Sequence, residues 1–504
     1  MQSIKKYVLV VCSLLLAISC SEDDKISPVK MKNDILEHPA CKGSFVSVNM
    51  AAEVAASFYD KALGKSSTRS SSEPSAIKAI NEDGAPLMYV FNYPDGGFVI
   101  VSATKDYYPI LAYSDESCFD TSAGIGGVTE WIKSTKNAIL SNESLNDSVK
   151  TEIKALWESL IAKDYSASLK ASTRSELTNA EIACYMRCED LLNQYGYEGD
   201  QGWHFCPLSD AQQVFEDAGF SGIYQSLCYS AEFNHSTPST SVLGWKICTV
   251  KRKVGPLITT NWHQNSPFND LCDGCPAGCG PIAFAQILKY YQYPASFTYN
   301  GHTFGWNTIP TAPDANSDQA ALVRIVGSFL ETSYHSNYSF VTPGDMEDGI
   351  ENCGFDVSVE DHLPFEVECE VMYSRRPVIM LGNDDNLSFL PGSLQYIGSS
   401  HYWICDGGNT MTLKKLFLFT EWQPYGNGNF VPGWNSIDDP YDFGGVTYTL
   451  LHMNWGWGGK CNGWFGSCTT PGYGYRYDNN YFDNSSDSDF EHSRKDFYIR
   501  RRYN

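Results

Sequence analysis

One cysteine of this chain lies where a thiol can act as a nucleophile. Cys279 follows a glycine-containing run, residues 274–278, and directly precedes a helical pattern. From Pro281 onward, apolar residues recur at the i, i+3, i+4 and i+7 spacing of a helix with one buried face: Phe284, Ile287, Leu288 and Tyr291. Free N–H groups and the helix dipole stabilise a thiolate at a helix N-terminus. The sequence therefore predicts a reactive Cys279 with a lowered pKa.

A thiol nucleophile needs a base, and the base needs a partner that orients it. His401 lies in an alternating segment that predicts a strand, on the same face as Trp403. A second predicted strand ends in Asn454 and Trp455, which could hydrogen-bond to the imidazole and shield it from water. His452, on the same face as Asn454, is the alternative base. The order Cys, His, Asn is that of papain-like cysteine peptidases.

Four blocks in this order resemble the streptopain-type cysteine peptidase precursors: residues 256–269, 278–290, 398–407 and 452–459. The resemblance implies that Cys279 is the nucleophile and that His401 is the general base and then the acid. It implies that Gln264, with the backbone N–H of Cys279, forms the oxyanion hole. It also implies that Asn454 orients His401 and that Trp455 packs over both.

The resemblance further implies an α+β fold in which residues 251–504 form a papain-like two-lobe catalytic domain. A helix-rich lobe would carry Cys279, and a β-rich lobe would carry His401 and Asn454. No metal or organic cofactor is expected. The sequence departs from the family at residues 280–282, Gly-Pro-Ile, where small or β-branched residues are usual. An alternative is a zinc site, since Cys-x-x-Cys is a common ligand spacing, formed by Cys272, Cys275, Cys279 and His263.

The N-terminal half predicts a separate unit. Helical spacing over residues 51–62 is followed by two β-rich runs, 88–91 and 98–101, around a Pro-Asp-Gly turn that predicts a hairpin. Helices are expected around residues 128–140 and 149–162. Residues 45–165 thus predict a small α+β domain, and they resemble the inhibitory prodomain of the same family. The expected partners are protein or peptide substrates and this prodomain, acting as an intramolecular inhibitor.

Residues 166–250 predict a cysteine-rich connector whose role the sequence does not indicate. The basic triplet at residues 251–253, Lys-Arg-Lys, is a candidate site for the activating cleavage. Residues 422–445 are rich in Gly, Pro, Asn and aromatics, which predicts long loops.

The extreme N-terminus predicts export. Lys5 and Lys6 precede an apolar stretch at residues 7–18, and a small residue precedes Cys20, as in the lipobox of bacterial lipoproteins. We expect residues 1–20 to be a lipoprotein signal peptide with lipid attached to Cys20, and residues 21–44 to be a linker. The expected location is the outer membrane or cell surface; a plain secretory signal is the alternative.

Composition agrees with a multidomain globular protein. The 504 residues correspond to roughly three domains at about 150 residues each. The formal net charge of −23 disfavours nucleic-acid binding, because phosphate backbones repel an acidic surface. We therefore expect a surface-anchored cysteine endopeptidase made as a zymogen. The alternatives are a catalytically inert binding or inhibitor protein on the same fold, and a carbohydrate-binding lipoprotein.

Overall fold

We describe a computed structural model of the chain. It describes residues 43–63, 73–121, 126–141, 242–310, 317–382, 400–425, 429–437, 446–466 and 494–502, with short pieces between residues 150 and 229. The expected signal peptide, Cys20 and the linker up to residue 42 lie outside these residues, as do most of the connector and most of the helix expected at 149–162. Within the described residues, no helix has both the length and the apolar character needed to cross a membrane.

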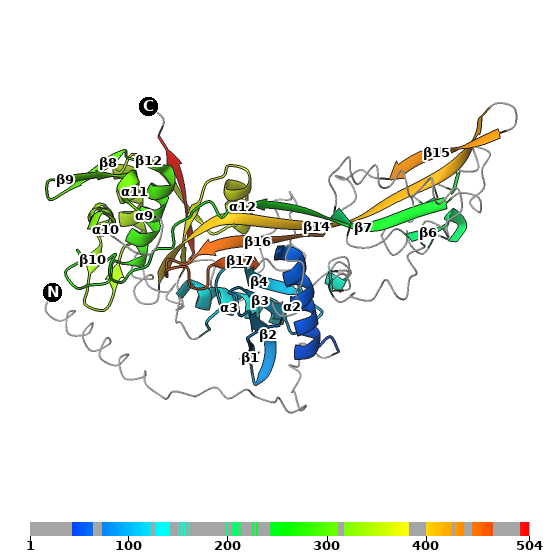
Figure 1. The fold of residues 1–504 in the computed structure, drawn as a ribbon, viewed down its shortest axis with the longest axis horizontal. Helices are drawn as coiled ribbons and strands as arrows, with labels where there is room; N and C mark the ends of the chain where they lie inside the picture. The colour runs from blue at the N-terminus through cyan, green and yellow to red at the C-terminus, as the bar shows by residue number, and fades with distance from the viewer. Residues whose placement is uncertain are drawn as a thin grey trace. The chain divides into compact units, whose positions relative to one another are not determined.

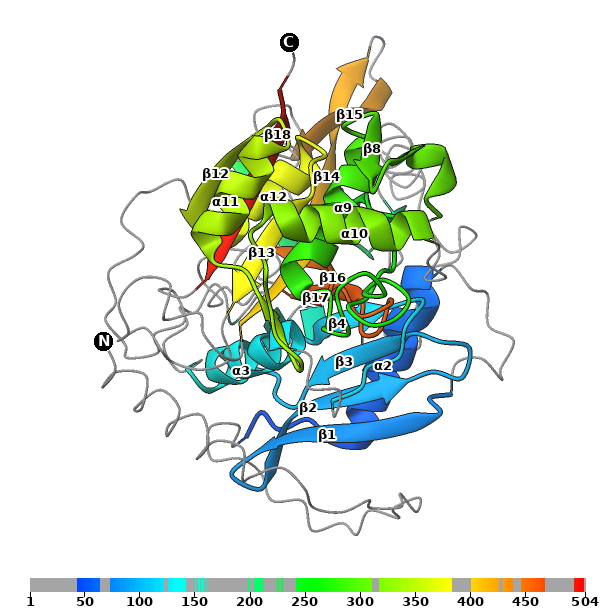
Figure 2. The same ribbon diagram turned by 90° about the vertical axis from the view of Figure 1, so that its left-hand side faces the viewer.

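The N-terminal unit is an antiparallel sheet with helices packed against it (Figure 2). Its elements are α2 (Val48–Leu63), β1 (Ala76–Glu82), β2 (Ala85–Asn92), β3 (Phe98–Ser102), β4 (Ile110–Ser114) and α3 (Gly126–Leu140). The strands follow one another in the order β1-β2-β3-β4. The hairpin between β2 and β3 turns at Gly96 and Gly97, whose φ angles of 85° and 96° favour glycine. The expected helices at 51–62 and 128–140 and the expected hairpin are confirmed.

The first part of the region expected to be catalytic is rich in helices (Figure 1). Three helices surround an apolar core that includes Phe284, Leu322 and Ile350. They are α9 (Cys279–Tyr291), α10 (Ser317–Phe329) and α11 (Pro343–Asn352). Smaller elements border them: β8 (Ser296–Tyr299), β9 (His302–Gly305), η5 (Trp306–Thr308), β10 (Ser333–Tyr334) and β11 (Ser339–Phe340). The helix expected after Cys279 is confirmed.

The second part is a sheet in the order β17-β16-β14-β13-β18-β12. The strands are β12 (Phe355–Asp361), β13 (Val378–Gly382), β14 (His401–Tyr425), β16 (Val446–Asn454), β17 (Gly463–Gly466) and β18 (Lys495–Arg501), with α12 (Pro364–Met372) packed on them. Cys279 thus lies in the helix-rich part, whereas His401 and Asn454 lie in the β-rich part. The expected α+β class, with a small α+β unit before a two-part catalytic region, is confirmed.

The N-terminal sheet and the catalytic sheet are hydrogen-bonded to each other. Strand β4 pairs with β17 through Tyr113 opposite Trp464 and Ala112 opposite Phe465 (Figure 2). One hydrophobic cluster also contains residues of both units, including Phe98 and Trp131 from the first and Trp455 and Phe465 from the second. The two units therefore share a sheet and a core.

The segment expected to form loops contains strands. β14 runs to Tyr425, and β15 (Asn429–Ile437) pairs with its outer half. β7 (Val242–Val254) pairs with β14 along its length, and two short strands pair with β7 in turn, β5 (Glu198–Gly199) and β6 (His204–Pro207), with η4 (Leu208–Asp210) after β6. The loop prediction for residues 422–445 was wrong for 422–425 and 429–437, because cross-strand pairing with β14 overrides the Gly and Pro content.

The basic triplet lies at the C-terminal end of β7. Lys251, Arg252 and Lys253 face Met411, Thr410 and Asn409 of β14. The Arg252 guanidinium lies 4.3 Å from the centre of the Tyr373 ring, and the Lys253 ammonium lies 4.5 Å from that of Trp464. A candidate cleavage site held in a sheet must leave its pairing before a protease can bind it.

Candidate active site

The start of α9 depends on one glycine. Gly278 precedes the helix with φ 93° and ψ 143°, a conformation that side chains disfavour. A Cβ there would lie 3.2 Å from both Pro281 and Ser339. The Gly278 carbonyl accepts a hydrogen bond from Ile282 N–H at 3.2 Å. Pro281 fits the first turn, where no N–H is needed, so the unusual Gly-Pro-Ile sequence after Cys279 is compatible with the helix.

The sulfur of Cys279 faces the strand that carries His401. The backbone N–H groups of Tyr402, Gly280 and Cys279 lie near this sulfur and lower the pKa of its thiol. Tyr402 follows His401 directly in β14, so Cys279 approaches the strand that carries the proposed base. The structure thus brings together two residues that are distant in sequence.

The pKa of Cys279 differs from the sequence-based expectation. Burial of the sulfur raises the pKa of the thiol, and the three backbone N–H groups lower it by a smaller amount. The helix N-terminus was expected to dominate and to lower the pKa. That expectation was wrong for this form of the chain, because desolvation of a thiolate costs more than these donors return.

His401 begins β14 and is 5% exposed. Its Nε2 lies 2.8 Å from the backbone carbonyl oxygen of Trp455. A carbonyl only accepts hydrogen bonds, so in this contact Nε2 carries the hydrogen and donates it. The neutral imidazole then has its basic lone pair on Nδ1.

Burial lowers the pKa of His401 to about 4, although the bond to Trp455 raises it. A neutral imidazole beside a neutral thiol is consequently the resting state at pH 7. Both the proton donor and the proton acceptor of the expected reaction are in the protonation states from which thiol-to-imidazole transfer begins.

Two tryptophans flank the imidazole. Trp403 stacks at 6.2 Å between ring centres, and Trp457 lies at 6.0 Å with a tilt of 34°. Trp457 was given no role from the sequence, although it lies in the block at residues 452–459 that resembles the family.

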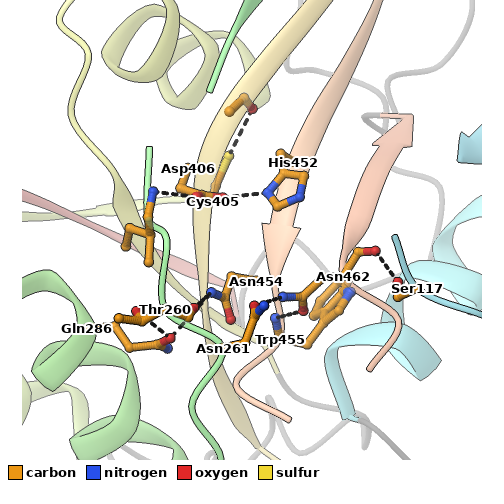
Figure 3. Close-up of polar contacts among 12 residues, drawn as sticks. Ser117, Thr260, Asn261, Gln286, Cys405, Asp406, His452, Asn454, Trp455 and Asn462 are labelled. Atoms are coloured by element: carbon orange, nitrogen blue, oxygen red, sulfur yellow. Dashed lines mark hydrogen bonds and ion pairs between the residues drawn. The ribbon is translucent and has the colours of Figure 1, made fainter. Parts of the chain in front are cut away.

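Asn454 does not contact His401 as expected. Its amide nitrogen donates to the carbonyl of Thr260 at 2.8 Å and lies 3.4 Å from the side-chain oxygen of Gln286 (Figure 3). Its amide oxygen accepts from Gly456 N–H at 3.2 Å. The orienting partner of His401 is the Trp455 carbonyl, and Asn454 supports the turn that carries this carbonyl.

Gln286 connects three segments of the site. It lies in α9, two turns after Cys279, and is 1% exposed. Its side-chain oxygen accepts from the Thr260 hydroxyl at 2.9 Å, in addition to Asn454 (Figure 3). It also accepts from Trp262 N–H at 3.3 Å. Gln286 lies in the block at residues 278–290 that resembles the family, but no role was predicted for it.

Trp455 is held by the turn that follows it. Its backbone N–H donates to the amide oxygen of Asn462 at 3.0 Å, and its indole N–H donates to Cys461 O at 2.9 Å. The Asn462 amide nitrogen in turn donates to Asn261 at 3.0 Å (Figure 3). Trp455 is 1% exposed, and its ring packs on Trp403, which itself stacks on His401.

Gln264 lies next to the nucleophile segment. Its backbone carbonyl accepts from Ala277 N–H at 2.9 Å, two residues before Cys279. Trp262 O accepts from Gly458 N–H at 3.0 Å, which joins the same loop to the turn that follows Asn454. The loop that carries the expected oxyanion donor is therefore fixed on both sides.

His452, the alternative base, is bound elsewhere. Its Nδ1 lies 2.6 Å from a carboxylate oxygen of Asp406, which is fully buried, and the other Asp406 oxygen accepts from Ile258 N–H at 2.9 Å (Figure 3). This pair ties β14, β16 and residue 258 together.

The structure gives no support to the zinc alternative. Among the residues that it describes, no group of three or more His, Cys, Asp or Glu side chains could hold a metal ion. Cys272, Cys275 and Cys279 are free thiols there.

The N-terminal unit covers the site from the β17 side. Gly127 of α3 lies so close to Trp455 that a Cβ on it would be 2.3 Å from that ring. The Trp131 indole N–H donates to Gly466 O at 3.0 Å. The Ser117 hydroxyl donates to Asn462 O at 2.5 Å (Figure 3). The first contact reaches Trp455, whose carbonyl holds His401, and the last reaches Asn462, which accepts from the Trp455 N–H.

Two family models match the chain. Residues 43–139 match the model of the Spi protease inhibitor family, and residues 262–465 match that of the Peptidase C10 family. The second range contains Gln264, Cys279, His401 and Asn454. The expectation of a streptopain-type cysteine peptidase precursor with an inhibitory prodomain is confirmed.

No curated protein is significantly similar to the chain. Among solved structures, a fragment of prointerpain A from Prevotella intermedia aligns with 15% sequence identity and a TM-score of 0.39. The alignment covers 85% of this chain and 99% of the fragment.

Proposed function

This chain belongs to the Peptidase C10 family and carries its own Spi-type inhibitory prodomain, and from that premise we propose that it is a cysteine endopeptidase in which Cys279 attacks peptide bonds. The observation that supports this assignment most is the position of Cys279 beside the backbone of Tyr402, the residue that follows His401, whose Nε2 is bound to the Trp455 carbonyl. The match to the family supports this reading over an inert binding or inhibitor protein.

In the proposed reaction, the Cys279 sulfur bonds to the carbonyl carbon of the scissile peptide while its proton passes to Nδ1 of His401. The oxyanion accepts hydrogen bonds from the Gln264 amide and the Cys279 backbone N–H. The Trp455 carbonyl holds the Nε2 hydrogen and stabilises the imidazolium. The leaving amine takes the proton from His401, and water, deprotonated by His401, hydrolyses the thioester.

The prodomain inhibits by keeping the site closed. It adds β4 to the edge of β17 and places α3 against Trp455 and Trp403. In this proposal the prodomain adds to the burial that raises the pKa of Cys279 and lowers that of His401. Removal of the prodomain hydrates both groups, which favours the thiolate and the imidazolium.

A fluorogenic-peptide or casein assay under reducing conditions tests the proposal. Wild-type protein freed of its prodomain should cleave the substrate, and the Cys279→Ser variant should lose the activity. An irreversible peptidyl epoxide should label Cys279 in wild type, and not in His401→Ala. Equal, slow labelling of both proteins would instead indicate an inert thiol.

We also propose that the mature protein is tethered by lipid on Cys20 to the outer membrane or the cell surface. The short apolar stretch before Cys20 supports this location. Detergent phase partitioning of wild type and Cys20→Ala tests it: the variant should move to the aqueous phase. Unchanged partitioning would exclude the lipid anchor.

A further inference from the structure

The loop that leads into the nucleophile helix contains two thiols that the proposed reaction does not use. Cys272 is 1% exposed and packs in the core, whereas Cys275 is partly exposed, and both are free. The backbone N–H of Cys275 donates to the carbonyl of Cys272 at 3.0 Å. This hydrogen bond closes a four-residue turn with a cysteine at each end.

The turn has a geometry that brings its two ends together. Asp273 and Gly274, its central residues, have φ angles of 53° and 80°, the positive signs of a type I′ turn. The first and last Cα atoms of a β-turn lie within about 7 Å, and disulfides join Cα atoms that are usually about 4.4–6.8 Å apart. We propose that Cys272 and Cys275 form a reversible disulfide that staples the nucleophile loop.

The turn selects this pair of cysteines. Its hydrogen bond joins Cys275 N–H to Cys272 O, whereas Cys279 lies outside the turn, at the first position of α9. We therefore expect Cys279 to stay free while the two loop cysteines pair.

The oxidation requires a small disulfide, such as glutathione disulfide. The Cys275 thiol, the more exposed of the two, loses its proton and attacks one sulfur of that molecule, releasing one glutathione thiol. Cys272 then loses its proton, attacks the Cys275 sulfur and releases the second glutathione thiol. One disulfide is reduced to two thiols, and two protein thiols become one disulfide.

The proposed disulfide lies in the segment between Gln264 and Cys279. The Asn269 side chain donates to Cys275 O at 2.8 Å, and Cys272 N–H donates to Asn269 O at 2.9 Å. Farther along, Ala277 N–H donates to Gln264 O. A covalent bond inside this loop removes conformations from the unfolded chain. It therefore limits the movement of the segment that joins Gln264 to Cys279.

Peptide mapping of the full-length Cys279→Ser protein tests the proposal without relying on activity. The protein is equilibrated with glutathione disulfide and glutathione, denatured, alkylated without reduction and digested with trypsin. Residues 254–289 form one tryptic peptide, since no Lys or Arg lies between Lys253 and Lys289. This peptide should carry no alkyl group and should be lighter than its reduced form by two hydrogen atoms.

The Cys275→Ser, Cys279→Ser double variant is the matched control and should carry one alkyl group, on Cys272. In wild type, a single alkyl group should be found on Cys279. Two alkylated cysteines in Cys279→Ser, a lasting glutathione adduct on Cys275, or a wild-type disulfide that includes Cys279 would each overturn the proposal. Oxidation should also raise the melting temperature of the Cys279→Ser chain by a few degrees. No oxidation-dependent shift in that chain would refute the stapling effect.

Discussion

The imidazole of His401 donates to the backbone carbonyl of Trp455, with 2.8 Å between Nε2 and the oxygen. The side chain of Asn454, the next residue back, binds Thr260 and Gln286 instead. The orientation of the base therefore depends on the conformation of a turn. Any residue that shapes this turn affects catalysis through the position of one carbonyl.

Replacing Asn454 should lower turnover without shifting the titration of His401. Asn454→Ala removes the donor to Thr260 O and leaves Gly456 N–H without its acceptor, which costs roughly 1–3 kcal/mol of folding stability. In the mature enzyme we expect kcat to fall while the acidic limb of the pH profile of kcat/KM keeps its position.

The matched control is Asn409→Ala, a buried asparagine of β14 whose amide binds Tyr113 of the prodomain. It should leave the kinetics of the mature enzyme unchanged. A shift of the acidic limb in Asn454→Ala would mean that Asn454 contacts His401 directly in the mature form.

The buried His401 makes precursor stability depend on pH. Its pKa is about 4 in the folded chain, and an unfolded histidine has a pKa near 6.5. Between these values the unfolded state binds the proton and the folded state does not, so stability is full above pH 6.5 and falls toward pH 4. The loss amounts to about 3 kcal/mol for this group.

Urea denaturation of the Cys279→Ser precursor at pH 7 and pH 4 measures this loss, with His401→Gln in the same background as the comparison. Other groups titrate in this range: burial also lowers the pKa of His362, and it raises that of Glu368 to about 7. The difference between the two proteins isolates His401. An identical pH dependence in both would contradict the predicted pKa shift.

The helix start at Cys279 could be predicted because its signal is local. A glycine-rich segment, a helical pattern after Pro281 and a cysteine between them define the start of α9 without reference to any distant residue. The strand that carries His401 was predicted for the same reason. The fold class followed from these elements and their order.

The hydrogen bonds of the site could not be predicted from the sequence. The acceptor for His401 is a backbone carbonyl, which every residue has, so no residue type indicates it. The pKa of Cys279 depends on how much protein surrounds the sulfur, which helix position alone does not determine. The composition of residues 429–437 predicted a loop. These residues form a strand because they pair with β14, and only the tertiary structure shows that partner.

Removing the Gln264 side chain should slow the chemical step. Gln264→Ala keeps the backbone carbonyl that binds Ala277 N–H, so the loop retains that contact. Loss of one oxyanion donor should lower kcat about 100-fold or more, roughly 3 kcal/mol, with little change in KM. Asn265→Ala, at the exposed neighbouring position, should have wild-type kinetics. A Gln264→Ala enzyme of normal kcat would remove this residue from the oxyanion hole.

The contact between Gly127 and Trp455 should control how tightly the prodomain closes the site. In Gly127→Ala the new Cβ would lie 2.3 Å from one atom of the Trp455 ring, 2.5 Å from another and 3.2 Å from Trp403. Packed rings have little room to move, and overpacking of this kind costs about 1–3 kcal/mol. We expect unprocessed Gly127→Ala precursor to react with a peptidyl epoxide about tenfold to hundredfold faster than wild type, since each tenfold corresponds to about 1.4 kcal/mol. Gly344→Ala, whose Cβ would meet only the Thr342 hydroxyl at 3.9 Å, is the control and should label at the wild-type rate. Because Gly127 lies in the prodomain, the mature enzymes released from both precursors should have the same kcat and KM; equal labelling of all three precursors would show that α3 does not close the site.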